Sequence, residues 1–200
     1  MTIKLKIILG TTRKGRFGDK PAHWILDEAK ALPDVDVELI DLRDYPLPHF
    51  DEPASPMWKK GRYDDEGVQR WADRIADGDA FVIVSPEYNH GYPAVLKNAI
   101  DYIYPEWVNK PVSFVSYGNA GGARAVEQLR QVAIEMQMWP VRSAIHIPVA
   151  VYLAVMHEPV PANPELFKPL KEGRVNQVER FFRELLWAAR ALKHARAEGN

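Results

Sequence analysis

The chain of 200 residues contains no cysteine. Disulfide scaffolds, cysteine-ligated zinc, iron–sulfur clusters and thiol nucleophiles are therefore excluded. The sequence also lacks a run of about 18 apolar residues, which a membrane-spanning helix needs. Residues 1–9 lack the apolar core and cleavage site of a signal peptide. These absences lead us to expect a soluble, cytoplasmic protein with no membrane partner.

Neither sign of charge is in excess, because 26 Lys and Arg residues face 27 Asp and Glu residues, for a net charge of −1. The chain as a whole therefore has no general attraction for nucleic acid. An anionic ligand would have to be bound by a local site. The composition, with 46% hydrophobic residues, predicts a packed globule, and we expect one domain over residues 1–200.

Catalytic and metal-binding patterns are also scarce. None of the six histidines stands at metal-ligand spacing with a carboxylate, so we expect no metal site. No Ser-His-Asp arrangement is visible along the sequence. Glu87 could serve as a general acid, but a solvated surface glutamate is the more common case. We therefore assign no catalytic residue.

Apolar runs alternate with helical patterns along the chain. Strands are predicted over residues 3–9, 35–40, 80–84, 111–117 and 141–147. Helices are predicted from Asp19, as a capping residue, to about residue 32, and over 64–76, 94–102, 123–138 and 175–189. This alternation predicts an α/β fold in which helices cover both faces of a parallel sheet. Five strands fit the flavodoxin-like doubly wound sheet with strand order 2-1-3-4-5.

The first candidate binding loop follows the first strand. Gly10 and Gly15 have the spacing of a nucleotide-triphosphate loop, but Phe17 stands where that motif needs a magnesium-binding hydroxyl. What remains is a loop with Thr11, Arg13 and Arg16 before the amino end of a helix. Such a loop suits a terminal phosphate monoester. An ordinary strand–helix turn with solvated arginines is the alternative.

The second loop, residues 85–93, follows the third strand and contains two prolines and two tyrosines. It is either a stiff turn with a buried tyrosine or the binding site of a flat ring with polar edges. In the second interpretation, backbone amides and the Asn89 side chain contact the heteroatom edge of a flavin ring. Tyr88 or Tyr92 would then line the ring pocket.

The third loop, residues 116–122, is rich in glycine and follows the fourth strand, so its backbone can approach a ligand closely. Alone it predicts only a turn with positive φ. In the predicted topology, however, the first, third and fourth strands end side by side at the switch point of the sheet. Three loops of this type at one sheet edge predict a shared ligand site.

Two irregular segments complete the chain. Residues 41–63 contain four prolines together with Tyr45, Phe50 and Trp58, and we interpret them as a wall of a substrate pocket. For residues 148–169 the sequence predicts no definite structure.

These three loops resemble those of the NADPH-dependent FMN reductases, a flavodoxin-like family that includes chromate, quinone and azo-dye reductases. The resemblance rests on Gly10–Arg13 with Gly15, on Ser85–Asn89 continuing through Pro93 and residues 96–101, and on Ser116–Gly118 followed by Gly122 and residues 124–130. It extends over about residues 1–147.

The resemblance implies a non-covalently bound FMN, with its phosphate at the first loop and its ring at the second and third. The implied cofactor contacts are Thr11, Arg13, Arg16, Phe17, Gly18, Pro86, Glu87, Tyr88, Asn89, Ser116, Tyr117 and Gly118. It also implies a homodimer or homotetramer. Val95, Ala99, Ile100 and Ile103 are candidates for that contact.

The implied activity is hydride transfer from NADPH or NADH to the flavin N5, followed by reduction of a small quinone, azo, chromate or free-flavin acceptor in a ping-pong sequence. Two alternatives share the fold. One is a flavodoxin-type electron carrier, which is usually strongly acidic; the other is a non-redox nucleotide-binding module.

Overall fold

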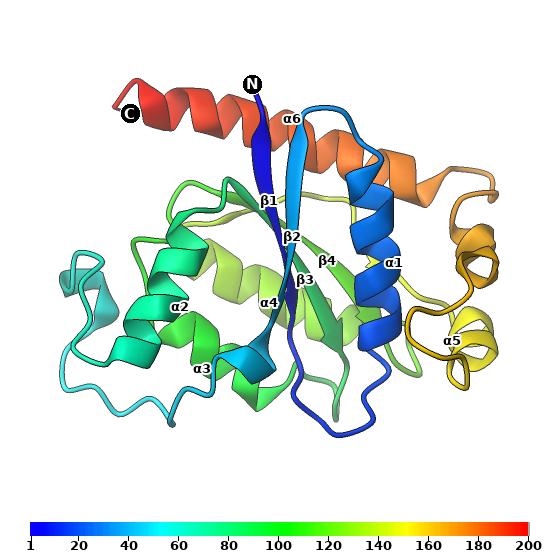
Figure 1. Cartoon of the computed structure of the whole chain (residues 1–200), viewed down its shortest axis with the longest axis horizontal. Helices are drawn as coiled ribbons and strands as arrows, with labels where there is room; N and C mark the ends of the chain where they lie inside the picture. Colours follow the sequence, from blue (N-terminus) through cyan, green and yellow to red (C-terminus); the bar gives the residue numbers. More distant parts are fainter. Residues whose placement is uncertain (200) are drawn as a thin grey trace.

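A twisted parallel sheet runs through the middle of the computed structural model, which describes residues 1–199 (Figure 1). Its strands are β1 (Ile3–Leu9), β2 (Val35–Asp41), β3 (Ala80–Pro86), β4 (Pro111–Tyr117), β5 (Trp139–Pro140) and β6 (Ile145–His146). The strand order is β2-β1-β3-β4-β5, with β6 also paired to β4. Every pairing is parallel, as between Ile7 and Leu39 or Val82. This order confirms the predicted flavodoxin-like topology.

Helices cover both faces of the sheet. They are α1 (Asp19–Lys30), α2 (Glu66–Ala76), α3 (Ala94–Asp101), α4 (Ala123–Glu135), α5 (Val149–Val155) and α6 (Gln177–Ala197), with short 3₁₀ turns η1 (Leu42–Asp44), η2 (Pro56–Trp58) and η3 (Pro164–Leu170). No helix within residues 1–199 has both the length and the apolar character to cross a bilayer.

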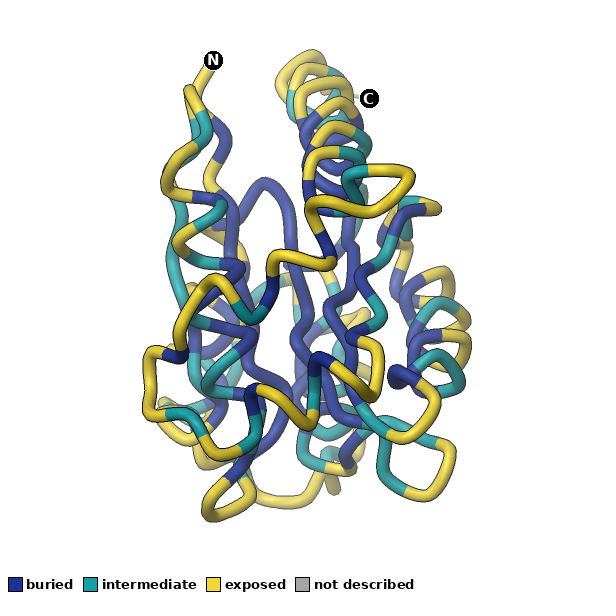
Figure 2. Tube along the Cα trace, turned by 90° about the vertical axis from the view of Figure 1, so that its right-hand side faces the viewer, coloured by how far each residue is buried: buried dark blue, intermediate teal, exposed yellow. Residues whose placement is uncertain are grey.

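The central strands are buried on both faces, which explains their continuous apolar sequence (Figure 2). Because side chains alternate along a strand, Ala80 and Val82 of β3 pack with α1, α5 and α6, whereas Phe81 and Ile83 pack with α2, α3 and α4. The sheet thus separates two cores and holds its loops at one fixed edge.

Three local predictions were wrong. The fifth strand is two short pieces, because the Arg130 side chain binds the carbonyls of Val141 and Arg142, and Ser113 binds that of Ser143. Helix α4 ends at Glu135, before Gln137 takes a left-handed φ of 54°. Asp19 does not cap α1, because Gly18 is the capping residue and the Asp19 carboxylate binds Arg16 instead.

The prediction that residues of α3 and the turn after it form a subunit contact also needs correction, because most of these residues are buried. Ala99, Ile100 and Ile103 are no more than 2% exposed and belong to the core under α3. Only Val95 of that set is partly exposed. A contact between subunits through α3 would therefore have to use other side chains.

Lys110 lies buried just before β4, where its ammonium group donates to the carbonyls of Ile75 (3.0 Å) and Ala76 (2.8 Å) at the end of α2. Burial, helped by repulsion from Arg196, lowers the pKa of Lys110 from 10.5 to about 8, although nearby carboxylates partly oppose the shift. The folded chain therefore binds this proton less tightly than the unfolded chain.

We expect the contribution of Lys110 to the free energy of unfolding to rise with pH between 8 and 10.5, because the unfolded chain binds more protons in that window. The measurement is urea unfolding of the wild type and of Lys110→Met at about pH 7.5 and about pH 9.5. The free energy of unfolding of the wild type, relative to that of the variant, should be larger at the higher pH. A constant or shrinking difference would contradict the assigned pKa.

Candidate functional site

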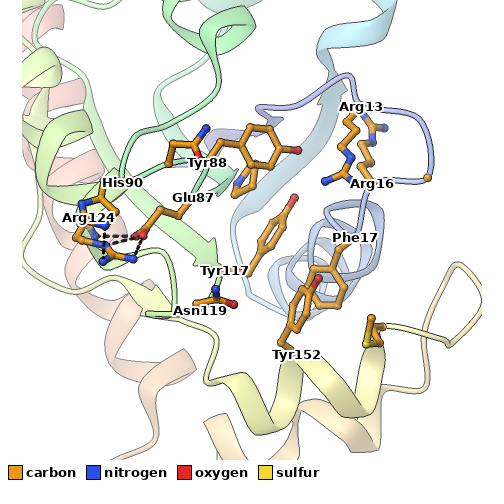
Figure 3. Close-up of a pocket in the computed structure, with 15 residues that line it drawn as sticks. Arg13, Arg16, Phe17, Glu87, Tyr88, His90, Tyr117, Asn119, Arg124 and Tyr152 are labelled. Carbon is orange, nitrogen blue, oxygen red and sulfur yellow. Dashed lines mark hydrogen bonds and ion pairs between the residues drawn. The ribbon is translucent and has the colours of Figure 1, made fainter.

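A cavity of about 600 Å³ opens where β1, β3 and β4 end (Figure 3). It brings together most of the residues that the sequence singled out. Lining it are Arg13, Arg16, Phe17, Pro86, Glu87, Tyr88, Asn89, Tyr117 and Gly118. Thr11, Gly18 and Ser116 are not among the lining residues. The three loops therefore converge as the topology predicted.

The first loop leads into the amino end of α1. Gly18 caps this helix without a side-chain hydrogen bond. In the first turn the Lys20 amide donates to the carbonyl of Phe17 at 3.0 Å, and Pro21 has no amide hydrogen. A Cβ at Gly18 would lie 2.6 Å from the hydroxyl oxygen of Tyr117, so only glycine fits there. The Arg13 side chain projects into the cavity beside this helix end (Figure 3). A helix amino end beside a guanidinium favours an anion.

Arg16 has a different role from Arg13, because its guanidinium is buried and faces the protein. It donates to Asp19 (2.6 and 3.0 Å), to Asp41 (2.7 Å) and to the carbonyl of Thr11. Burial alone would raise the pKa of Asp41, but hydrogen bonds and charge from Arg16 and Arg43 hold it below its usual value. Arg16 thus ties the first loop to the end of β2.

Further contacts fix the first loop. Arg43 donates to the carbonyl of Arg13 at 2.6 Å, and the hydroxyls of Thr11 and Tyr88 lie 3.1 Å apart. The second contact joins the first loop to the second. Thr11 is only 1% exposed, so its hydroxyl serves this junction.

The second loop turns sharply after Tyr88. Tyr88 and Gly91 exchange two backbone hydrogen bonds of 2.8 and 3.0 Å, and Asn89 and His90 between them have φ of 50° and 70°. Two successive left-handed residues are the geometry of a tight primed turn, which Asn tolerates well. Pro86 to His90 line the cavity, whereas Tyr92 does not.

Glu87 is engaged in an ion pair. Its carboxylate accepts from Arg124 Nε at 2.6 Å and from the Arg124 amide at 3.1 Å, in the first turn of α4 (Figure 3). Burial would raise the pKa of Glu87, but the bonds and charge of Arg124 lower it below the usual value. Glu87 is therefore ionised at neutral pH and caps α4, which argues against a role as general acid.

The third loop approaches the second closely. Gly118 has φ of 148°, and a Cβ there would lie 3.1 Å from Cβ of Glu87. The Glu87 amide donates to the carbonyl of Tyr117 at 2.9 Å. Ser116 stands behind the wall, where its hydroxyl donates to the carbonyl of Gly121 at 2.8 Å. The glycines and Ser116 therefore set the shape of the cavity.

Tyr117 carries a hydroxyl that is buried and has no hydrogen-bond partner among residues 1–199. Figure 3 shows this side chain among the lining residues, with the hydroxyl toward Arg16, and the residue is only 5% exposed. Burial raises the pKa of Tyr117, so the group stays protonated and can donate. An unpaired buried hydroxyl costs about 1–3 kcal/mol, which a bound acceptor would offset.

Sequence reasoning missed several lining residues. His90, Asn119 and Arg124 lie inside the segments 85–93, 116–122 and 124–130, but none of them was singled out as a contact. Tyr152 belongs to α5 and Met156 caps the carboxyl end of that helix, in a segment without a recognisable period.

None of the residues of the long loop 41–63 lines this cavity, but Tyr45, Pro46 and Leu47 line another cavity of about 280 Å³ against α3, so its role in a substrate pocket stays a prediction. The Asn98 side chain instead holds the Phe50 amide (2.9 Å) and the Pro48 carbonyl (2.6 Å) against α3.

Comparisons with known proteins identify the family of this chain. The sequence profile of the NADPH-dependent FMN reductase family matches residues 3–151, which is most of the chain. An NAD(P)H-dependent FMN reductase of Schizosaccharomyces pombe is 40% identical over 150 residues, covering 74% of this chain and 75% of the relative. A quinone reductase of Escherichia coli strain K12 is 36% identical over 142 residues, covering 67% of this chain and 72% of the relative.

Solved structures show the same fold. The flavoenzyme NAD(P)H:(acceptor) oxidoreductase FerB of Paracoccus denitrificans has a TM-score of 0.59 at 26% identity, covering 73% of this chain and 79% of that one. A structure of RosB has a TM-score of 0.65 at 16% identity, covering 96% of this chain and 81% of that one. The chain belongs to the NADPH-dependent FMN reductase family, whose members are NAD(P)H-dependent FMN and quinone reductases.

Proposed function

We propose that this cavity binds FMN, with the phosphate at the amino end of α1 and the ring at the edge formed by Pro86–Asn89 and Gly118. The buried hydroxyl of Tyr117, which has no partner among residues 1–199, carries this proposal, because it leaves in the cavity wall a donor that a bound acceptor would satisfy. Arg13 adds a positive charge beside the amino end of α1, where the helix dipole favours an anion.

The residues at the other end of the cavity fit a polar ring edge. The loop of Pro86 to Asn89 and the backbone at Gly118 can approach a flat ligand closely, because no Cβ projects at Gly118. Thr11, Arg16, Gly18 and Ser116 would act indirectly, by positioning the loops that hold the ligand.

FMN, when bound, supplies the redox chemistry by accepting a hydride from NADPH or NADH and passing two electrons to a second substrate. The protein binds and orients the ring, and its amides stabilise negative charge at the ring edge. Glu87, already ionised and paired with Arg124, moves no proton. Because both substrates must reach the same ring face, we expect them to bind in turn.

A quinone is the acceptor that we propose. Two relatives support this choice, the quinone reductase of Escherichia coli and a 2-hydroxy-1,4-benzoquinone reductase of a Burkholderia species that is 31% identical over 142 residues. His90, Asn119 and Arg124 form a polar rim beside the proposed ring site. Such a rim suits the carbonyl oxygens of a quinone.

We also propose that the chain forms a homodimer or homotetramer. Support comes from two large apolar side chains on the surface, since Trp187 is 74% exposed on α6 and Trp139 is 57% exposed on β5.

The direct test is reconstitution. We expect the purified protein, incubated with FMN and desalted, to keep a flavin absorbance band, which NADPH or NADH bleaches without oxygen and a quinone restores. Riboflavin, which lacks the phosphate, serves as the control and should be retained less well. Failure to retain FMN would overturn the proposed function.

Arg13→Ala should weaken FMN binding by about 1.5–3 kcal/mol, because it removes a charge-assisted bond to the phosphate. Fluorescence titration of FMN measures the affinity. Lys14→Ala is the matched control, since Lys14 is an exposed cation in the same loop that does not line the cavity. Equal losses in both variants would show that Arg13 acts only through general charge.

A further inference from the structure

The short helix α5 supplies a wall of the cavity from outside the region that matches the family. The family profile ends at residue 151, whereas Tyr152, which Figure 3 shows beside Phe17, and Met156 both line the cavity. No motif in the sequence assigned a role to this segment. Its position beside the phosphate end therefore needs a separate explanation.

The spacing of residues along α5 gives each of its faces a different environment. Val151 and Val155, four residues apart, are buried in the core at 5% and 0% exposure. Tyr152 comes directly after Val151, and Met156 comes directly after Val155. The two side chains therefore share the adjacent face, which lines the cavity. Leu153 points to solvent at 56% exposure. The helix is thus anchored on one side and free to contact a ligand on the next.

The anchoring extends to α1. Residues of η3 pack on α5, and Phe167 of η3 stacks on Trp24 of α1 at 4.5 Å between ring centroids. Both helices that border this end of the cavity therefore belong to one packed unit.

Tyr152 also forms part of an aromatic cluster at the amino end of α1. The centroid of its ring lies 4.5 Å from that of Phe17 and 6.4 Å from that of Tyr117. The ring planes of Tyr152 and Tyr117 are only 15° apart. Gly18 borders the Tyr117 hydroxyl on the other side. Tyr152 and Gly18 together confine the ring whose hydroxyl has no protein partner.

We propose that α5, through Tyr152 and Met156, forms a retaining wall over the phosphate end of the cavity. The inference rests on the proposed FMN site and deepens it. The wall excludes water from the bound phosphate region and must be passed when the ligand leaves. Removing the wall should therefore raise the rate of FMN dissociation and leave the contacts between the protein and the ring unchanged.

The test compares how fast FMN leaves reconstituted protein after dilution, followed by the recovery of FMN fluorescence. Tyr152→Ala should speed release about tenfold or more, which is about 1.4 kcal/mol if association is unchanged. Tyr152→Phe, which keeps the ring, should stay within about threefold of the wild type. Leu153→Ala, on the same helix but facing solvent, is the control and should match the wild type.

Lumiflavin, the ring system without ribityl chain or phosphate, separates the two ends of the cavity. Its affinity should be unchanged in Tyr152→Ala. An equal loss for FMN and lumiflavin would contradict a wall at the phosphate end. If Tyr152→Ala unfolds, Met156→Ala carries the same comparison, because it leaves the aromatic cluster intact.

The outcomes separate this inference from the proposed function. Wild-type protein that retains no FMN overturns the proposed function. Wild-type protein that retains FMN, while Tyr152→Ala and Met156→Ala release it at the wild-type rate, overturns the wall alone.

Discussion

A hydroxyl buried without a partner is the constraint on which the cavity depends. Tyr117 stands at the end of β4 and packs against Phe17, which in turn packs against Tyr152, and its hydroxyl lies against Gly18. The nearby hydroxyl of Tyr88 already has a contact with Thr11. Such a hydroxyl lowers the stability of the folded chain unless another group accepts a hydrogen bond from it. The surrounding packing keeps the Tyr117 donor in place and leaves its acceptor to a ligand.

Two ion pairs hold the loops around this hydroxyl. Arg16 joins the first loop to Asp41 at the end of β2, and Glu87 of the second loop caps α4 through Arg124. In both pairs the charges offset each other, and the pairs fix the geometry of the loops. Arg13 makes no such pair among residues 1–199 and faces the cavity. The division between positioning and binding arginines follows from which guanidinium is buried.

The sequence predicted the sheet order and the meeting of three loops, because strand periodicity and turn residues depend on local chemistry and the topology rules do the rest. It could not distinguish Arg13 from Arg16, since two arginines in one glycine-rich loop look alike until Asp41 is placed beside one of them. The family resemblance carried the assignment to FMN. The contacts of single side chains came only with the fold.

Three further features of the structure also depend on contacts that the local sequence does not show. Interruption of the fifth strand depends on side-chain bonds from Arg130 and Ser113, which lie on other elements. The loop of residues 41–63 has the composition of a pocket wall but is held to α3 by Asn98. The wall at Tyr152 comes from a seven-residue helix too short to show a period. Each case is decided by packing between segments far apart in the chain.

The role of the Tyr117 hydroxyl in FMN binding is tested by comparing the wild type with Tyr117→Phe, in which only the hydroxyl is removed. Fluorescence titration gives the affinity for FMN, and thermal unfolding of the FMN-free proteins gives their stability. We expect the variant to lose about 1.5–3 kcal/mol of FMN binding. Its FMN-free form should unfold at the same temperature as the FMN-free wild type or at a higher one. Unchanged FMN affinity, or a less stable FMN-free variant, would contradict this role of the hydroxyl.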